Sequence, residues 1–376
     1  AVAECVRAGI RVIMITGDHP LMARHIAMDL GMPGAERPLT GKDIEELEED
    51  VLAERAAATS VFARVSPEHK LRIIDALQAD GEIVSMTGDG VNDAPALKSA
   101  NIGVAMGITG TDVAKEASDM VLLDDRFNTI VAAVREGRVI FDNIRRFIRY
   151  ILASNSGELL VMFMAPFFGL PLPLLPVQIL WMNLVTDGLP ALALVVEKGE
   201  SGVMRRPPRD PQAPIIDWGM GFHIGWVGLL MAAVSLAVAL RYTTGIPVAA
   251  TGGHGGAAHA VEASTWQTML FSSMVFGQFF LALAVRSTTD SLFTMGIFSN
   301  RSMILALAVT FLLQMGVIYL PPLQTFFRTT PLNLPQLGLC MLAGAVLFVA
   351  VEIEKMVLRM RQRSGRNPSG PAVVLR

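Results

Sequence analysis

The sequence contains few cysteines and few charged residues, and both shortages limit what the protein can be. Its two cysteines, Cys5 and Cys340, lie far apart, so a disulfide framework is not indicated. Only 17% of the residues are charged and the formal net charge is −3, which predicts no nucleic-acid partner. By contrast, 52% are hydrophobic and the mean hydropathy is +0.47, which is too apolar for a purely soluble protein of 376 residues.

Charge and hydrophobicity divide the chain into two parts. Residues 1–150 carry most of the acidic groups and alternate between β-rich and helical patterns, whereas residues 150–358 form long apolar blocks separated by short polar loops. The chain opens inside an apparent helix and shows no signal peptide, so we expect it to begin in the middle of a domain. Length alone predicts two or three domains.

The first part is predicted to be an α/β domain. We expect strands at 11–16, 61–63, 82–86 and 102–106, and helices at 21–30, 40–58, 67–79 and 95–99. The 67–79 helix has a strong start, with Ser66 as the cap and Pro67 at its first position. Strands and helices in alternation predict a parallel sheet with helices on both faces.

Residues 86–98, Met-Thr-Gly-Asp-Gly-Val-Asn-Asp-Ala-Pro-Ala-Leu-Lys, are the most informative stretch. They place Asp89 and Asp93 on a glycine-rich turn at the carboxyl end of a predicted strand, where open α/β sheets bind ligands. Paired carboxylates suit Mg²⁺, which takes one or two of them and completes its shell with water and phosphate oxygens, and Asn92 can assist through its amide.

Two other segments are expected to contact the phosphate group that a magnesium ion at Asp89 and Asp93 would bind. Thr16 and Gly17, followed by Asp18, end a predicted strand and can offer a hydroxyl and a backbone N–H to phosphate oxygens. Lys70, near a helix start, can supply a fixed positive charge during phosphoryl transfer.

Six apolar blocks predict six membrane-spanning helices. They lie at about 147–169, 174–196, 219–241, 265–285, 302–320 and 334–355, each close to the ~20 residues needed to span a bilayer. Lysines and arginines concentrate in the 197–217 loop and the C-terminal tail, which predicts that both are cytoplasmic, together with the α/β domain. The loop at 251–259 would be external; its His254 and His259 could bind a metal, but a flexible glycine-rich linker is favoured.

Polar residues inside these blocks indicate a cation site. They are Asn155, Glu158, Asn183, Thr186, Asp187 and Gln278. Ionisable groups at membrane depth are costly and usually mark an ion path, although a structural hydrogen-bond network between helices is the alternative. All of these donors are oxygens, which suits a hard cation such as calcium, and the lack of cysteine or histidine argues against zinc or copper.

These motifs resemble those of a known family. The 86–98 stretch resembles the hinge motif of P-type cation-transporting ATPases, and residues 153–158 and 181–190 closely resemble calcium pumps of the sarcoplasmic-reticulum type. The resemblance covers nearly the whole chain and is weakest beyond about residue 240. It implies part of a haloacid dehalogenase-like, Rossmann-like phosphorylation domain at 1–127, a stalk helix at 128–149, six transmembrane helices at 147–358 and a basic cytoplasmic tail at 359–376.

The resemblance also implies roles for individual residues. It implies that the phosphate site is formed by Thr16, Gly17, Asp18 and Lys70, and that magnesium is bound by Asp89, Asn92 and Asp93. Arg64 would lie at the edge of the nucleotide site. The transported ion would be bound by Asn155, Glu158, Asn183, Thr186, Asp187 and Gln278. In one departure, animal calcium pumps carry a glutamate where Gln278 aligns, so the number of ions stays open.

The family's Asp-Lys-Thr-Gly-Thr nucleophile motif does not occur in the sequence. The resemblance therefore implies a missing N-terminal portion of the same polypeptide as a partner, and we expect this chain alone neither to hydrolyse ATP nor to transport ions. The full-length protein would use ATP and Mg²⁺ to export calcium across a lipid bilayer, most simply a bacterial plasma membrane. A manganese, sodium or other cation pump remains an alternative, as does a non-catalytic regulatory or relic membrane protein.

Overall fold

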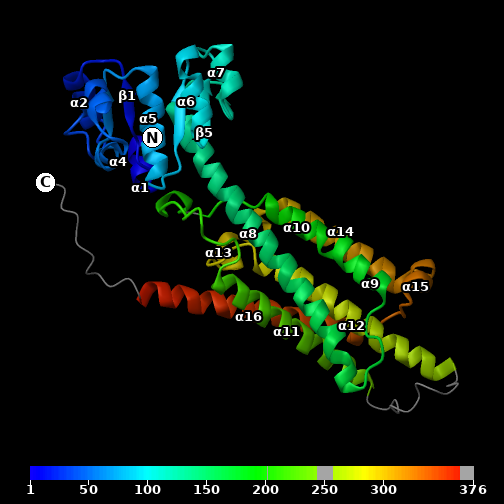
Figure 1. Cartoon of the computed structure of the whole chain (residues 1–376). Helices are drawn as coiled ribbons and strands as arrows, with labels where there is room; N and C mark the ends of the chain where they lie inside the picture. Colours follow the sequence, from blue (N-terminus) through cyan, green and yellow to red (C-terminus); the bar gives the residue numbers. More distant parts are fainter. Residues whose placement is uncertain (201, 244–256, 365–376) are drawn as a thin grey trace. The chain divides into compact units, whose positions relative to one another are not determined.

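The computed structural model describes residues 1–200, 202–243 and 257–364 (Figure 1). The predicted loop around His254, the side chain of His259 and the tail beyond residue 364 lie outside the described part. The chain divides into two compact units, which are Ala1–Arg138 with Ser201–Pro211, and Val139–Glu200 with Gln212–Arg376.

The first unit alternates short strands and helices. In chain order they are α1 (Val2–Arg7), β1 (Met14–Thr16), α2 (Pro20–Asp29), β2 (Leu39–Thr40), α3 (Gly41–Glu46), α4 (Glu49–Ala58), β3 (Val61–Ala63), α5 (Pro67–Ala79), β4 (Ser85–Gly88), η1 (Val91–Asp93), α6 (Ala94–Ser99), β5 (Ile102–Met106), α7 (Asp112–Ala117) and β6 (Met120–Leu122), with the 3₁₀ turn η4 (Val203–Arg205) from the later segment. The predicted α/β class is confirmed.

All strand pairs are parallel, but the strands form two sheets where the sequence predicts one. Their orders are β1-β3-β2 and β4-β5-β6, so β1 and β4 are both edge strands. Ile15 of β1 nevertheless packs against the apolar clusters of both sheets. The alternating pattern predicts parallel pairing but does not say which strands are neighbours, since that depends on contacts between distant segments.

Three other details of this unit differ from the sequence prediction. The single helix predicted at 40–58 is two helices, because the backbones of Leu47 and Glu48 are extended between α3 and α4. The predicted 82–86 strand is displaced, since β4 runs from Ser85 to Gly88. The strands β2 and β6 and the helix α7 were not predicted. The predicted cap of α5 is present, with Ser66 accepting a hydrogen bond from the backbone N–H of His69.

The second unit is helical. It contains most of α8 (Phe127–Met164), then η2 (Ala165–Phe168), α9 (Pro176–Trp181), η3 (Met182–Thr186), α10 (Gly188–Val195), α11 (Trp218–Thr243), α12 (Ala257–Ala284), α13 (Leu292–Met295), η6 (Ile297–Ser299), α14 (Arg301–Tyr319), α15 (Pro321–Phe327) and α16 (Leu334–Ser364). Six candidate membrane spans occur among the described residues, as predicted, at Phe127–Phe168, Pro176–Val195, Trp218–Thr243, Thr265–Ala284, Arg301–Tyr319 and Leu334–Arg361.

The helix predicted at 174–196 is interrupted. Gly188 and Pro190 predict a weak point, and the structure places the irregularity just before them, in the π-helical turn η3. There the backbone N–H of Asp187 donates to the carbonyl of Met182 at 2.8 Å, one residue beyond the α-helical spacing. Such π turns occur frequently at functional sites.

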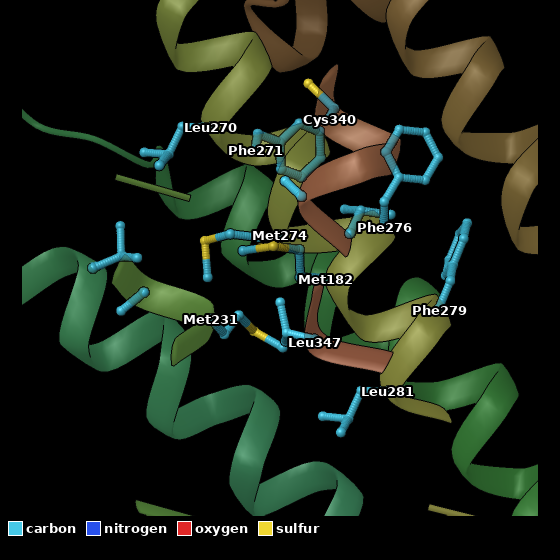
Figure 2. Close-up of a cluster of buried hydrophobic side chains, with 14 of the residues drawn as sticks. Met182, Met231, Leu270, Phe271, Met274, Phe276, Phe279, Leu281, Cys340 and Leu347 are labelled. Carbon is cyan, nitrogen blue, oxygen red and sulfur yellow. The ribbon is translucent and has the colours of Figure 1, made fainter. Parts of the chain in front are cut away.

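The core of this unit combines aliphatic side chains with several methionines and aromatic residues. Met182, Met231, Met274 and Phe276 are buried in one apolar cluster, which Figure 2 shows in close-up. The cluster draws on η3, α11, α12 and α16. It therefore packs against the turn that precedes Asp187.

A glycine permits close contact between α12 and α16. A Cβ atom at Gly344 would lie 2.7 Å from the backbone carbonyl of Phe276, whereas one at Gly338, on the same helix, would meet nothing within 4 Å.

We therefore expect Gly344→Ala to destabilise the unit by about 1–3 kcal/mol, because the two helices would have to move apart. Gly338→Ala is the matched control and should be neutral or slightly stabilising. Thermal unfolding of the purified protein in detergent would measure both changes. Equal unfolding temperatures for the two variants would contradict the prediction.

Candidate phosphate site and cation site

Lys70 and Asp93 form the centre of the first candidate site. The Lys70 ammonium donates to Asp93 Oδ1 at 2.5 Å, linking the first turn of α5 to η1. Asp93 Oδ2 accepts from the backbone N–H groups of Asp89 and Gly90, both at 3.2 Å. The Asp93 carboxylate is thus buried and has partners at both oxygens.

The balance of these contacts keeps Asp93 ionised. Burial alone would raise its pKa, but the hydrogen bond and charge of Lys70, together with the backbone donors, lower the pKa below its usual value. Gly88 makes this arrangement possible, because a Cβ there would lie 2.6 Å from the Cβ of Asp93.

Asp89 is the more available carboxylate of the predicted magnesium pair. Its side chain is exposed, as is that of Asn92, while its carbonyl accepts from the backbone N–H of Thr111 at 2.9 Å, which holds the loop in place. A divalent cation that keeps several waters fits an exposed carboxylate beside a second, oriented one. The donor set therefore suits Mg²⁺.

The Thr16–Asp18 turn follows the carboxyl end of β1, as the Asp89 turn follows that of β4. Its side chains do not share the hydrogen-bond network of Lys70 and Asp93. Thr16 Oγ1 donates to Asp18 Oδ2 at 3.0 Å, and the backbone carbonyls of these two residues accept from Val65 and Arg64. Within the described part of the chain, no hydrogen bond joins these side chains to Lys70, Asp89 or Asp93. Gly17 is exposed, and so is Arg64, which adopts a left-handed backbone with φ of 54°.

The second candidate site lies among α8, the η3–α10 segment and α12. Glu158 Oε2 accepts from the amide of Asn183 at 3.1 Å, and Glu158 Oε1 accepts from the amide of Gln278 at 3.0 Å. Gln278 Oε1 in turn accepts from the hydroxyl of Thr186 at 2.6 Å. Four of the six predicted cation ligands therefore form one continuous network across three helices.

Asp187 and Asn155 complete the set in a different way. Asp187 Oδ1 accepts from the hydroxyl of Tyr150 at 2.8 Å, but among the described residues Asp187 Oδ2 and Asn155 Oδ1 are buried without a hydrogen-bond partner. Buried polar atoms without partners are costly. An unpartnered carboxylate oxygen of Asp187 and an unpartnered amide oxygen of Asn155 are what an oxygen-coordinated cation substrate would satisfy. We call these six residues, with Tyr150, the cation cluster.

Neither site is a dense cluster of metal-binding side chains. Across residues 1–200, 202–243 and 257–364, no group of three or more His, Cys, Asp or Glu could hold a metal ion. Each candidate site instead pairs two carboxylates with neutral oxygen donors. This composition favours hard cations over transition metals.

Two family models match the chain and decide its affiliation. Residues 1–101 match the haloacid dehalogenase-like hydrolases, and residues 171–357 match the C-terminus of cation-transporting ATPases. The chain belongs to the P-type cation-transporting ATPases.

Curated relatives of this family align over most of the chain. It is 48% identical to a calcium-transporting ATPase of Bacillus subtilis over 89% of its length, and 42% identical to a probable cation-transporting ATPase F of Mycobacterium tuberculosis over 96%. An endoplasmic reticulum-type calcium-transporting ATPase 4 of Arabidopsis thaliana is 37% identical over 99%. The matched region covers only 36%, 39% and 39% of these ATPases, respectively.

Tyr150 is the member of the ATPase cation cluster that the sequence analysis missed. It is fully buried and bonds to Asp187, yet a tyrosine in an apolar helix reads as ordinary core. The available signal was its position two helical turns before Glu158, on the same helix face.

Replacing Lys70 should make stability depend on pH in a defined direction. In the wild type, the lowered pKa of Asp93 gives a stabilisation that is present above the unfolded value of ~3.9 and is lost as the pH falls through the folded value. In Lys70→Met, Asp93 stays buried without its cation, so its pKa rises. We expect a loss of about 1–3 kcal/mol at pH 7 that shrinks toward pH 4.

Calorimetric unfolding at several pH values between 7 and 4 would measure this difference. Lys98→Met, at an exposed lysine on α6, is the control and should behave like the wild type. A deficit in Lys70→Met that is independent of pH would count against the proposed pairing.

Proposed function

We propose that this chain supplies the magnesium–phosphate site and the membrane cation site of an ATP-driven pump that exports calcium from the cytoplasm. The observation that carries the proposal is the cation cluster, in which Glu158 and Asp187 are buried within candidate membrane spans and two oxygens, one of them on Asp187, lack a hydrogen-bond partner among the described residues. Charged groups at membrane depth are retained where they bind or move ions. Calcium is favoured over other hard cations because the matched relatives include calcium-transporting ATPases.

In the proposed reaction, the residues of the first unit bind the phosphate and shield its charge. The Thr16 hydroxyl and the Gly17 N–H would hold phosphate oxygens, and Lys70 would offset developing negative charge while it orients Asp93. Asp89, with Asn92, would hold Mg²⁺, which when bound neutralises phosphate charge. Arg64 would lie at the edge of the nucleotide site.

The nucleophile of the proposed aspartyl-phosphate reaction would come from outside these 376 residues. Both β1 and β4 are edge strands with unpaired backbone groups, and they end next to Thr16 and Asp89, respectively. One additional parallel strand between them would carry its carboxyl end to the same edge. The relatives, of which the chain spans little more than a third, have the length to provide it.

In the second unit, the cation would replace hydrogen bonds already present in the cluster. Asp187 Oδ2 and Asn155 Oδ1 are open, whereas Glu158 would become a ligand by releasing the amides of Asn183 and Gln278. The proposed orientation has the first unit, the 197–217 loop and the C-terminus in the cytoplasm, in a bacterial plasma membrane.

The cation role is tested by Glu158→Gln and Asp187→Asn in the full-length protein. Either change should lower calcium affinity by roughly 100-fold or more, since each removes a charged ligand. Calcium-activated phosphorylation by ATP should then be lost while phosphorylation by inorganic phosphate remains. Glu136→Gln, on an exposed part of α8, is the control. Calcium transport at normal affinity in both site variants would refute the cation site.

The magnesium role is tested by Asp89→Asn in the same protein. Phosphoenzyme formation should fall by about 100-fold or more, because the metal's charge stabilisation is lost, while radiolabelled calcium binding stays intact. Asp112→Asn, at an exposed carboxylate on α7, serves for comparison. Normal phosphoenzyme levels in Asp89→Asn would remove this residue from the magnesium site.

A further inference from the structure

A second buried polar network lies in the helical unit, outside the cation cluster. Its centre is an ion pair in which Arg286 Nε and Nη2 donate to the two carboxylate oxygens of Glu197, at 2.7 and 3.0 Å. The side chains are 0% and 1% exposed. The remaining Arg286 N–H groups donate to the carbonyls of Gly296 and Ile297 and to Ser299 Oγ.

This pair stands at the end of α10. Asn300 donates from one amide nitrogen to the Ala193 carbonyl at 3.0 Å and to Glu197 Oε2 at 2.9 Å, while its Oδ1 caps α14. From α8, Asn143 donates to the carbonyls of Val195 and Glu197. The last carbonyls of a helix have no partners within the helix, so these side chains fix where α10 ends.

A second ion pair extends the network. Arg146 donates to Glu200 Oε1 at 2.8 Å and to Asn143, and Ser287 donates to the same Glu200 oxygen at 2.8 Å. Burial would raise the pKa of Glu200, but the charge of Arg146 and the hydrogen bond from Ser287 lower it, so this carboxylate is held ionised.

The network joins the three helices that supply the cation cluster. It holds Asn143 and Arg146 of α8, the residues that follow α10, and Arg286 and Ser287 just beyond the end of α12. The guanidinium of Arg286 also lies where the carbonyl ends of α10 and α12 concentrate negative partial charge. The other ion pairs of the helical unit among the described residues, Arg145–Asp217, His223–Glu354 and Glu352–Lys355, do not connect the end of α10 to α8 or α12.

The position of α10 needs such a fixed point. The π turn η3 separates α10 from α9 on the side of the cation cluster. Regular α-helical hydrogen bonding from α9 therefore does not fix the axial position or the rotation of α10. Asp187 directly precedes α10, and the eight residues of that helix, Gly188–Val195, form a rigid length of about 12 Å whose last carbonyls belong to the network. A shift at Glu197 would therefore move Asp187.

We propose that the Glu197–Arg286 ion pair is a positioning element of the cation cluster, fixing α10 against α12 and thereby Asp187 against Gln278. The inference rests on the proposed cation function of that cluster. Buried ion pairs add little net stability compared with packed apolar side chains, and setting register is their best-supported use. The geometry of the pair, more than its charge, is therefore what the cation site depends on.

The test uses the full-length protein with Arg286→Lys, which keeps the charge but loses the two-pronged contact, and with the double variant Glu197→Leu/Arg286→Met, which leaves no unpaired charge. We expect the calcium concentration for half-maximal phosphorylation to rise by roughly 5- to 20-fold in both. Selectivity for calcium over the larger strontium should also change. Phosphorylation by inorganic phosphate without calcium should remain near wild-type levels.

The matched control is Glu352→Leu/Lys355→Met, which removes a buried ion pair within α16, a helix that supplies no member of the cation cluster. It should leave calcium affinity and selectivity unchanged. Unchanged affinity in both Arg286 variants, or a fall in phosphorylation from ATP and from inorganic phosphate to the same extent, would overturn the positioning role. If the wild type shows no calcium-dependent phosphorylation, the proposed pump function fails instead.

Discussion

A carboxylate buried in an apolar bundle must be matched by donors or by a cation, and the helical unit is arranged around this requirement. Glu197 is matched in full by Arg286 and Asn300. Glu158 is matched by neutral amides, which can be released at lower cost than a charged partner. Asp187 keeps one oxygen without a partner. Carboxylates with fixed partners thus hold the structure, and those with exchangeable partners are the ones we propose as cation ligands.

The α/β unit also contains two carboxylates that differ in how fully their oxygens are hydrogen-bonded. Asp93 is buried and has partners at both oxygens, whereas Asp89 remains exposed. In the proposed sites, one carboxylate whose oxygens have partners thus lies near another that keeps an exposed or unpartnered oxygen. A cation bound there would meet side chains that are already ordered by the neighbouring acid and its donors.

Much of the fold followed from local pattern. The length and hydropathy of six blocks predicted the spans, and Ser66 with Pro67 predicted the start of α5. The predictions that failed concern contacts between distant segments or a local break in a helix. The division into two sheets depends on which distant strands meet, and the break between α3 and α4 lies at Leu47 and Glu48, whose backbones are extended. Neither changes the periodicity of the sequence.

The sequence by itself determined the chemical nature of the sites, because oxygen donors in apolar helices and paired aspartates on a glycine-rich turn are costly patterns with few uses. Only the tertiary structure decided which donors meet. It joined Gln278 to Glu158 and Thr186 from a distant helix, brought in Tyr150, and placed Arg286 against Glu197. Those pairings depend on how helices pack, and side-chain contacts between elements far apart in the chain leave no mark on local periodicity.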